Sequence, residues 1–154
     1  MRMNAEQIRD YAKFAQHVRT ALPAVVREKK IVEAIKNHSG ADEAIIMKGL
    51  TWGSGPIINV KALVPQQRDG HVYTPTGGYT LHSDTIDVSM ADVGRYQTGQ
   101  DIRSTGRGQV HLITIILLHE LTHWAREKSG TNETPGKEDG FEFEEEVYGR
   151  IIER

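Results

Sequence analysis

The sequence contains no cysteine, and this single absence removes several classes of site. Disulfide bonds, structural zinc sites built from thiolates and cysteine nucleophiles are all excluded. The absence says nothing about the compartment in which the protein works, because cysteine-free proteins also occur among secreted proteins.

Long apolar runs and a strong net charge are also missing. The longest apolar run, residues 110–118, is too short to cross a bilayer, and residues 1–6 lack the apolar region of a signal peptide. The formal net charge is −2 and no basic face is apparent, which argues against nucleic acid as a partner. We therefore expect a soluble protein without a signal peptide or membrane span.

What the sequence does contain is enough chain for one packed domain. A length of 154 residues fits a single domain, residues 1–154, that buries its own core. Near the start, Asn4 and Gln7 resemble a capping box, and apolar residues then recur at helical spacing from Ile8 to Leu22. A second helix is expected to end near residues 37–40. On the polar faces of these helices, His17 is expected to be a solvated surface histidine.

The apolar pattern changes after residue 41. Residues 44–47 and 57–64 are short runs of the kind found in strands, and residues 85–90 alternate between apolar and polar side chains. Ile86 and Val88 fall on the apolar side of this alternation, so one face of that strand is expected to be buried. These runs predict a small twisted mixed sheet.

The most informative stretch is an HExxH motif at the end of the longest apolar run. On a helix, His119 and His123 lie one turn apart on the same face, so both imidazoles can reach one metal ion. Glu120 lies about 100° round the helix, where it can touch a metal-bound water without ligating the metal. This pattern predicts one Zn²⁺ ion, held by the two histidines, with Glu120 as the general base.

The residues before the motif strengthen this interpretation. Residues 110–118 are apolar almost all the way round the helix, which is typical of a helix buried in a core. Two histidines and a carboxylate buried there without a metal would be costly to desolvate, whereas a zinc ion gives all three a partner.

A catalytic zinc needs a third protein ligand and one open position. Residues 141–152 contain four glutamates, and helical phase distinguishes them. Glu144 is the one whose neighbours one turn away are all apolar, so it is our prediction for the third ligand. Glu145 is the second choice, and Glu142 and Glu146 lie on more polar faces.

An HExxH helix followed by a second helix that returns a glutamate to the metal resembles the gluzincin branch of the zincin superfamily. The resemblance implies a peptidase in which Glu144 is the third ligand, and the strand at residues 85–90 is similar to the edge strand along which zincin substrates lie. The Asn-Glu-x-x-Ser/Asp motif that usually surrounds the third ligand in this family is absent. Its oxyanion-stabilising residue has no motif here, and Tyr148 is our candidate.

The chain is also similar to the small metallopeptidase domains of bacterial polymorphic toxins and type VI secretion spike effectors. The similarity is carried by its compact length and by its ending, Phe-Glu-x-x-Val-Tyr-Gly at residues 143–149. It implies delivery by a dedicated secretion system, a protein or peptide substrate, and a cognate immunity or inhibitor protein.

We therefore expect an α+β, zincin-like single domain with N-terminal helices, a small mixed sheet, a buried HExxH helix and a C-terminal helix that carries Glu144. The expected reaction is zinc-dependent hydrolysis of peptide bonds. Two alternatives stay open at this point: a zinc amidase or deacetylase that acts on a cell-wall or other non-protein amide, and a catalytically silent zinc-binding interaction module.

Overall fold

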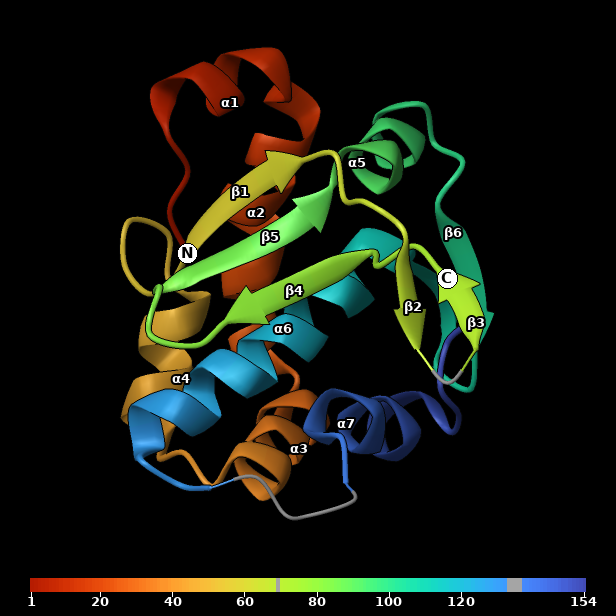
Figure 1. Ribbon diagram of the computed structural model, residues 1–154. Coiled ribbons are helices and arrows are strands. Elements are labelled where there is room, and N and C mark those ends of the chain that lie inside the picture. Colours follow the sequence, from red (N-terminus) through yellow and green to blue (C-terminus); the bar gives the residue numbers. More distant parts are fainter. Residues whose placement is uncertain (69, 133–136) are drawn as a thin grey trace.

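The fold is arranged around one buried helix, α6 (Leu112–Ser129), which contains the HExxH motif. In the computed structural model, which describes residues 1–68, 70–132 and 137–154, α6 crosses the molecule behind the sheet (Figure 1). It contacts helices on several sides and two strands of the sheet. The helix ends at Gly130, which adopts the left-handed conformation that favours glycine at a helix C-terminus.

The other helices surround α6. They are α1 (Ala5–Asp10), α2 (Ala12–Ala24), the short 3₁₀ helix η1 (Val25–Arg27), α3 (Lys29–Ser39), α4 (Glu43–Leu50), α5 (Met90–Gln97) and α7 (Asp139–Tyr148). The strands are β1 (Ile57–Lys61), β2 (Gln66–Arg68), β3 (His71–Tyr73), β4 (Gly77–Thr80), β5 (Thr85–Ser89), β6 (Ile102–Thr105) and β7 (Gly108–His111).

The main sheet has the order β1-β5-β4 and is mixed. Strand β1 runs parallel to β5, and β4 runs antiparallel to it. The alternation expected for residues 85–90 is present as far as Val88, since Ile86 and Val88 are fully buried, but Met90 is exposed and begins α5. The expected edge position of this strand is wrong: β5 lies in the centre, and β4 forms the edge beside α6. One buried face gives the same alternation in central and edge strands, so periodicity could not separate them.

Residues 44–47 were expected to form a strand, and this expectation is also wrong. They lie in α4, whose first turn is capped by Asp42, the side chain of which accepts a hydrogen bond from the Ile45 amide at 2.9 Å. Ile46 and Leu50, one turn apart, are both buried. A short apolar run fits a buried strand or a buried helix equally well, and the capping aspartate is what distinguishes them.

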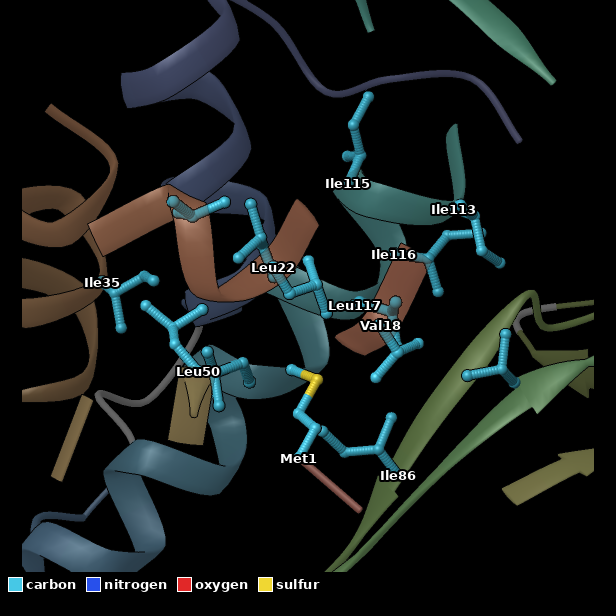
Figure 2. Close-up of a cluster of buried hydrophobic side chains, with 14 of the residues drawn as sticks. Met1, Val18, Leu22, Ile35, Leu50, Ile86, Ile113, Ile115, Ile116 and Leu117 are labelled. Carbon is cyan, nitrogen blue, oxygen red and sulfur yellow. The ribbon is translucent and has the colours of Figure 1, made fainter. Parts of the chain in front are cut away.

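The apolar core fixes the position of α6. Its first half meets side chains from the N-terminal helices, from α4 and from β5 (Figure 2). The labelled core side chains are Met1, Val18, Leu22, Ile35, Leu50, Ile86, Ile113, Ile115, Ile116 and Leu117. Because full burial of one such side chain contributes about 1.5–3 kcal/mol, this half of the helix anchors the second half, which carries the histidines.

The architecture confirms the expected α+β class, with helices at the N-terminus, a small mixed sheet, a buried motif helix and a C-terminal helix. None of the helices in the described residues has the length and apolar character that a bilayer crossing requires. One N-terminal detail differs from expectation: His17 is buried rather than solvated, and its Nε2 lies 2.9 Å from Thr114 Oγ1 of α6.

Candidate metal centre

The histidines of the motif share one face of α6. The rings of His119 and His123 are 5.2 Å apart between centroids. His119 and Glu120 are buried and His123 is half-buried. One ligand atom from each of the three lies within 4.8 Å of the others, which makes them a group that could hold a metal ion.

A glutamate that the sequence analysis did not consider completes this cluster. Glu138 Oε1 lies 2.5 Å from Nε2 of His123 and 3.3 Å from Nε2 of His119. The other oxygen of Glu138 caps α7, where it accepts a hydrogen bond from the Phe141 amide at 2.5 Å. The cap therefore fixes one oxygen and leaves the other facing both histidines.

Glu144 lies on the opposite side of the His119 ring. Its Oε1 is 2.8 Å from His119 Nδ1, and its Oε2 accepts the Ile152 amide at 2.8 Å. Arg154 Nη2 donates a further hydrogen bond to Oε1 at 2.6 Å. Glu144 is completely buried and contacts the ring nitrogen that does not face Glu138. This is the arrangement in which a carboxylate fixes the orientation and tautomer of a metal-ligating histidine.

Gly140 allows α7 to approach the His119 ring. A Cβ atom added at Gly140 would lie 2.4 Å from three atoms of that ring, including Nε2. Any side chain here would displace the imidazole or the start of α7. The close approach of this glycine is what brings Glu138 and Glu144, at the two sides of Gly140 in sequence, to the two nitrogens of one histidine.

Charges in the cluster shift the ionisation of its members. Burial alone would lower the pKa of His119, but hydrogen bonds to Glu138 and Glu144 and the charge of Glu120 raise it to about 9. The pKa of Glu138 falls well below its usual range: its burial opposes the fall, and the hydrogen bonds to His119 and His123 outweigh it. These carboxylates favour the protonated form of the His119 imidazole, so the site attracts positive charge.

The pKa of Glu120 is raised, whereas that of Glu138 is lowered. Burial raises the pKa of Glu120, and the nearby His119 and His123 offset part of this rise. Its side chain lies against Gly77 of the edge strand, where an added Cβ would come within 3.0 Å of Glu120 Oε1. The absence of a side chain at Gly77 therefore lets the backbone of β4 lie directly on this carboxylate.

Two cavities meet at His119 and Glu120. The first, of about 760 Å³, runs past Tyr79 and Leu81 and contains Glu138. The second, of about 620 Å³, extends on the other side, from Thr76 to Arg154. Both are lined by Gly77 and Gly78, so together they follow the edge strand on either side of the motif.

The remaining candidates lie elsewhere. Tyr148 is buried and lines neither cavity, and Glu145 is exposed. His82 lies at the rim of the first cavity with its side chain 87% exposed. The sequence predicts a loop at residues 131–140, and of these, residues 133–136 lie outside the described part of the chain.

Glu138 and Arg154 were not predicted as site residues, and the sequence carries little signal for either. Glu138 precedes a helix at a position that favours capping residues, but the sequence analysis began that helix at residue 141. Arg154 follows α7 with no periodic signal, and only the fold brings it back to Glu144.

Comparison with known proteins agrees with this site. No curated protein and no solved structure matches the chain. The family model of metallopeptidase toxin 3 matches residues 7–149, nearly the whole chain, which confirms the resemblance to metallopeptidase toxin domains. A metallopeptidase is a hydrolase that acts on protein and uses a metal, for which His119, Glu120 and His123 are the candidate group. The chain therefore belongs to the metallopeptidase toxin 3 family.

Proposed function

We propose that the chain is a zinc-dependent peptidase in which His119, His123 and Glu138 hold the ion and Glu120 is the general base. One observation carries the proposal: Glu138 Oε1 lies within 3.3 Å of Nε2 of both histidines, with Glu120 next to them. Two imidazole nitrogens and one carboxylate oxygen are a ligand set found in catalytic zinc sites, which keep a further position open.

The surroundings of the donors also fit zinc. Glu144 holds the Nδ1 side of His119, so Nε2 is the nitrogen available to a metal. The donors are nitrogen and oxygen atoms with no sulfur, at the meeting point of two cavities, where substrate could reach the ion. A closed structural site would not need this access.

The third ligand is the part of the proposal that differs from the sequence analysis. Glu144, which the sequence predicts as the third ligand, is the alternative to Glu138. We favour Glu138, since it faces Nε2 of both histidines, whereas Glu144 contacts only Nδ1 of His119 and is already bonded to Ile152 and Arg154. In this assignment Glu144 orients His119 instead of ligating the metal.

The reaction follows from the environment of Glu120. A zinc ion would supply Lewis acidity, which polarises a carbonyl and makes water acidic near neutral pH. Glu120, whose pKa is raised by burial, takes a proton from the attacking water and returns it to the leaving amine. A Cβ added at Gly78 would meet nothing within 4 Å, so the edge strand β4 is open there and leaves space for a peptide.

The biological setting belongs to the same proposal. The family is one of toxins, which supports a secreted effector that cleaves protein in a target cell. A cognate immunity protein would then protect the producing cell, and covering the two cavities would be sufficient for this.

The test is the substitution Glu120→Gln in the zinc-loaded protein, with Glu145→Gln as the matched control, since Glu145 is an exposed carboxylate on α7. Loss of a general base predicts a fall of about 10²–10⁴-fold in peptide hydrolysis. Zinc content, measured by atomic absorption, should stay at one ion per chain in both variants.

Three results would contradict the proposal. Full activity in Glu120→Gln would remove the proposed base. A purified protein that binds no zinc would remove the metal centre. Hydrolysis of peptidoglycan or acetylated substrates with no cleavage of any peptide would favour the amidase alternative.

A further inference from the structure

The two cavities that meet at the metal centre differ in charge. The first contains Arg126, but this arginine forms an ion pair with Asp139 and donates to the carbonyl oxygens of His38 and Asn132. Its charge is therefore used to hold the fold. The second cavity contains Arg154, which is the one arginine or lysine among the described residues that line it.

The position of Arg154 is fixed by three contacts. Its Nη2 donates to Glu144 Oε1 at 2.6 Å and lies 3.0 Å from His119 Nδ1, and its guanidinium lies 5.8 Å from the centre of the Phe141 ring. Glu144 and Phe141 belong to α7, which the metal-facing Glu138 caps, and His119 belongs to the motif helix α6. The guanidinium is thus held beside the reaction centre without the loss of entropy that a free arginine would suffer on binding.

These contacts use only part of the guanidinium. Among the hydrogen bonds of the described residues, those of Arg154 involve Nη2, which leaves the donors of Nε and Nη1 for another group. The side chain is 21% exposed and lines the cavity. The other lining side chains include apolar Phe141 and Ile151, which would exclude water from such a contact. A guanidinium in this setting matches a carboxylate, to which Nε or Nη1 can donate a charge-assisted hydrogen bond.

We propose that Arg154 is a specificity-determining residue that selects a peptide carboxylate in the second cavity, on the side of the cleaved bond away from Glu138. This inference rests on the proposed peptidase function. The carboxylate has two sources, an Asp or Glu side chain close to the cleaved bond or the C-terminal carboxylate of a short substrate. Both present the same chemistry to the guanidinium.

The test measures binding, so that it does not depend on hydrolysis. The full chain with Glu120→Gln is loaded with zinc, immobilised, and exposed to a random peptide mixture with acetylated and amidated ends. A second mixture has free C-terminal carboxylates and lacks Asp and Glu. We expect about ten-fold enrichment either of acidic residues at one position of the first mixture or of peptides from the second, as a charge-assisted hydrogen bond allows.

Adding Arg154→Gln should abolish this enrichment, whereas Arg150→Gln, an exposed arginine that lines neither cavity, should leave it unchanged. Because Arg154 also contacts Glu144, its loss could weaken zinc binding for a purely positioning reason. The ratio of affinities for a Glu peptide and its Gln counterpart separates the two roles, since a positioning defect lowers both equally. Arg154→Lys should retain part of the ratio.

Two results would overturn the inference: no enrichment of carboxylates in either mixture, or an enrichment that persists in Arg154→Gln. Neither depends on catalysis. A failure of the proposed function would appear instead as absence of Glu120-dependent cleavage or of bound zinc.

Discussion

One histidine cluster lies at the N-terminus of α6 and another lies further along the same helix. The pKa values of His17 in the first and His119 in the second shift in opposite directions. At the N-terminal end, His17 and His111 lie with their rings 5.9 Å apart beside Tyr96. At the other end, His119 and His123 lie 5.2 Å apart. Burial lowers the pKa of His17 to about 4, whereas the pKa of His119 rises to about 9.

The difference lies in the number of carboxylates around each pair. The N-terminal cluster contains one, Asp101, which accepts from His111 Nδ1 and faces the amides that start α6. His17 contacts the neutral hydroxyl of Thr114 instead. The C-terminal pair faces several carboxylates, among them Glu138 and Glu144. Two adjacent histidines therefore do not favour positive charge by themselves: the carboxylates around them make the difference.

The largest expected effect tests which carboxylate supplies the charge that holds the metal. Since four-ligand structural sites gain about 10–16 kcal/mol from zinc, loss of one ligand should cost about 3–4 kcal/mol, so Glu138→Gln should weaken zinc binding by several hundred-fold, on the order of 150- to 900-fold. Glu144→Gln should weaken it only about 10–100-fold, as expected for a residue that orients a ligand. Competition with a chromophoric chelator measures both. A larger loss in Glu144→Gln would return the third-ligand role to Glu144.

The next effect concerns His17 and acid. The pKa of His17 is about 4 in the folded protein and 6.5 in the unfolded chain. As pH falls below 6.5, the unfolded chain therefore binds a proton that the folded protein does not, which favours unfolding. The free energy of unfolding should therefore fall by about 3 kcal/mol as pH drops from 6.5 to 4. Urea unfolding of the metal-free protein should show this fall, and His17→Gln should reduce it.

The control for this measurement is His82→Gln, since the His82 side chain is 87% exposed. It should keep the acid sensitivity of the parent protein. An unchanged pH dependence in His17→Gln would show that His17 does not titrate as its surroundings require.

The smallest effect tests the packing of α7 against His119. Gly140→Ala places a Cβ 2.4 Å from the His119 ring and should lower the free energy of unfolding by about 1–3 kcal/mol, with weaker zinc binding, because the imidazole is displaced. Gly94→Ala is the matched control, because Gly94 lies in α5 with open space around its Cα. Thermal unfolding with and without zinc compares them. Equal stability of the two variants would remove the proposed constraint on His119.

The parts of the fold that could be predicted from the sequence are those set by local periodicity. The apolar run before the motif predicted a buried helix, and Ile86 and Val88 predicted a strand with one buried face. Residues 44–47 were misassigned because four apolar residues fit either period, and the deciding contact is a cap from Asp42. His17 was misassigned because a polar residue on a helix gives no sign that α6 covers it.

The sequence by itself determined the local chemistry: no thiolates, and two histidines and a glutamate that the 3.6-residue repeat of one helix brings close together. The tertiary structure alone decided what faces them. Glu138 meets Nε2, Glu144 meets Nδ1, β4 becomes the edge strand and Arg154 returns to the second cavity. These contacts join segments far apart in the chain, and they depend on where the chain reverses and how closely Gly140 lets it pack, which no short-range repeat encodes.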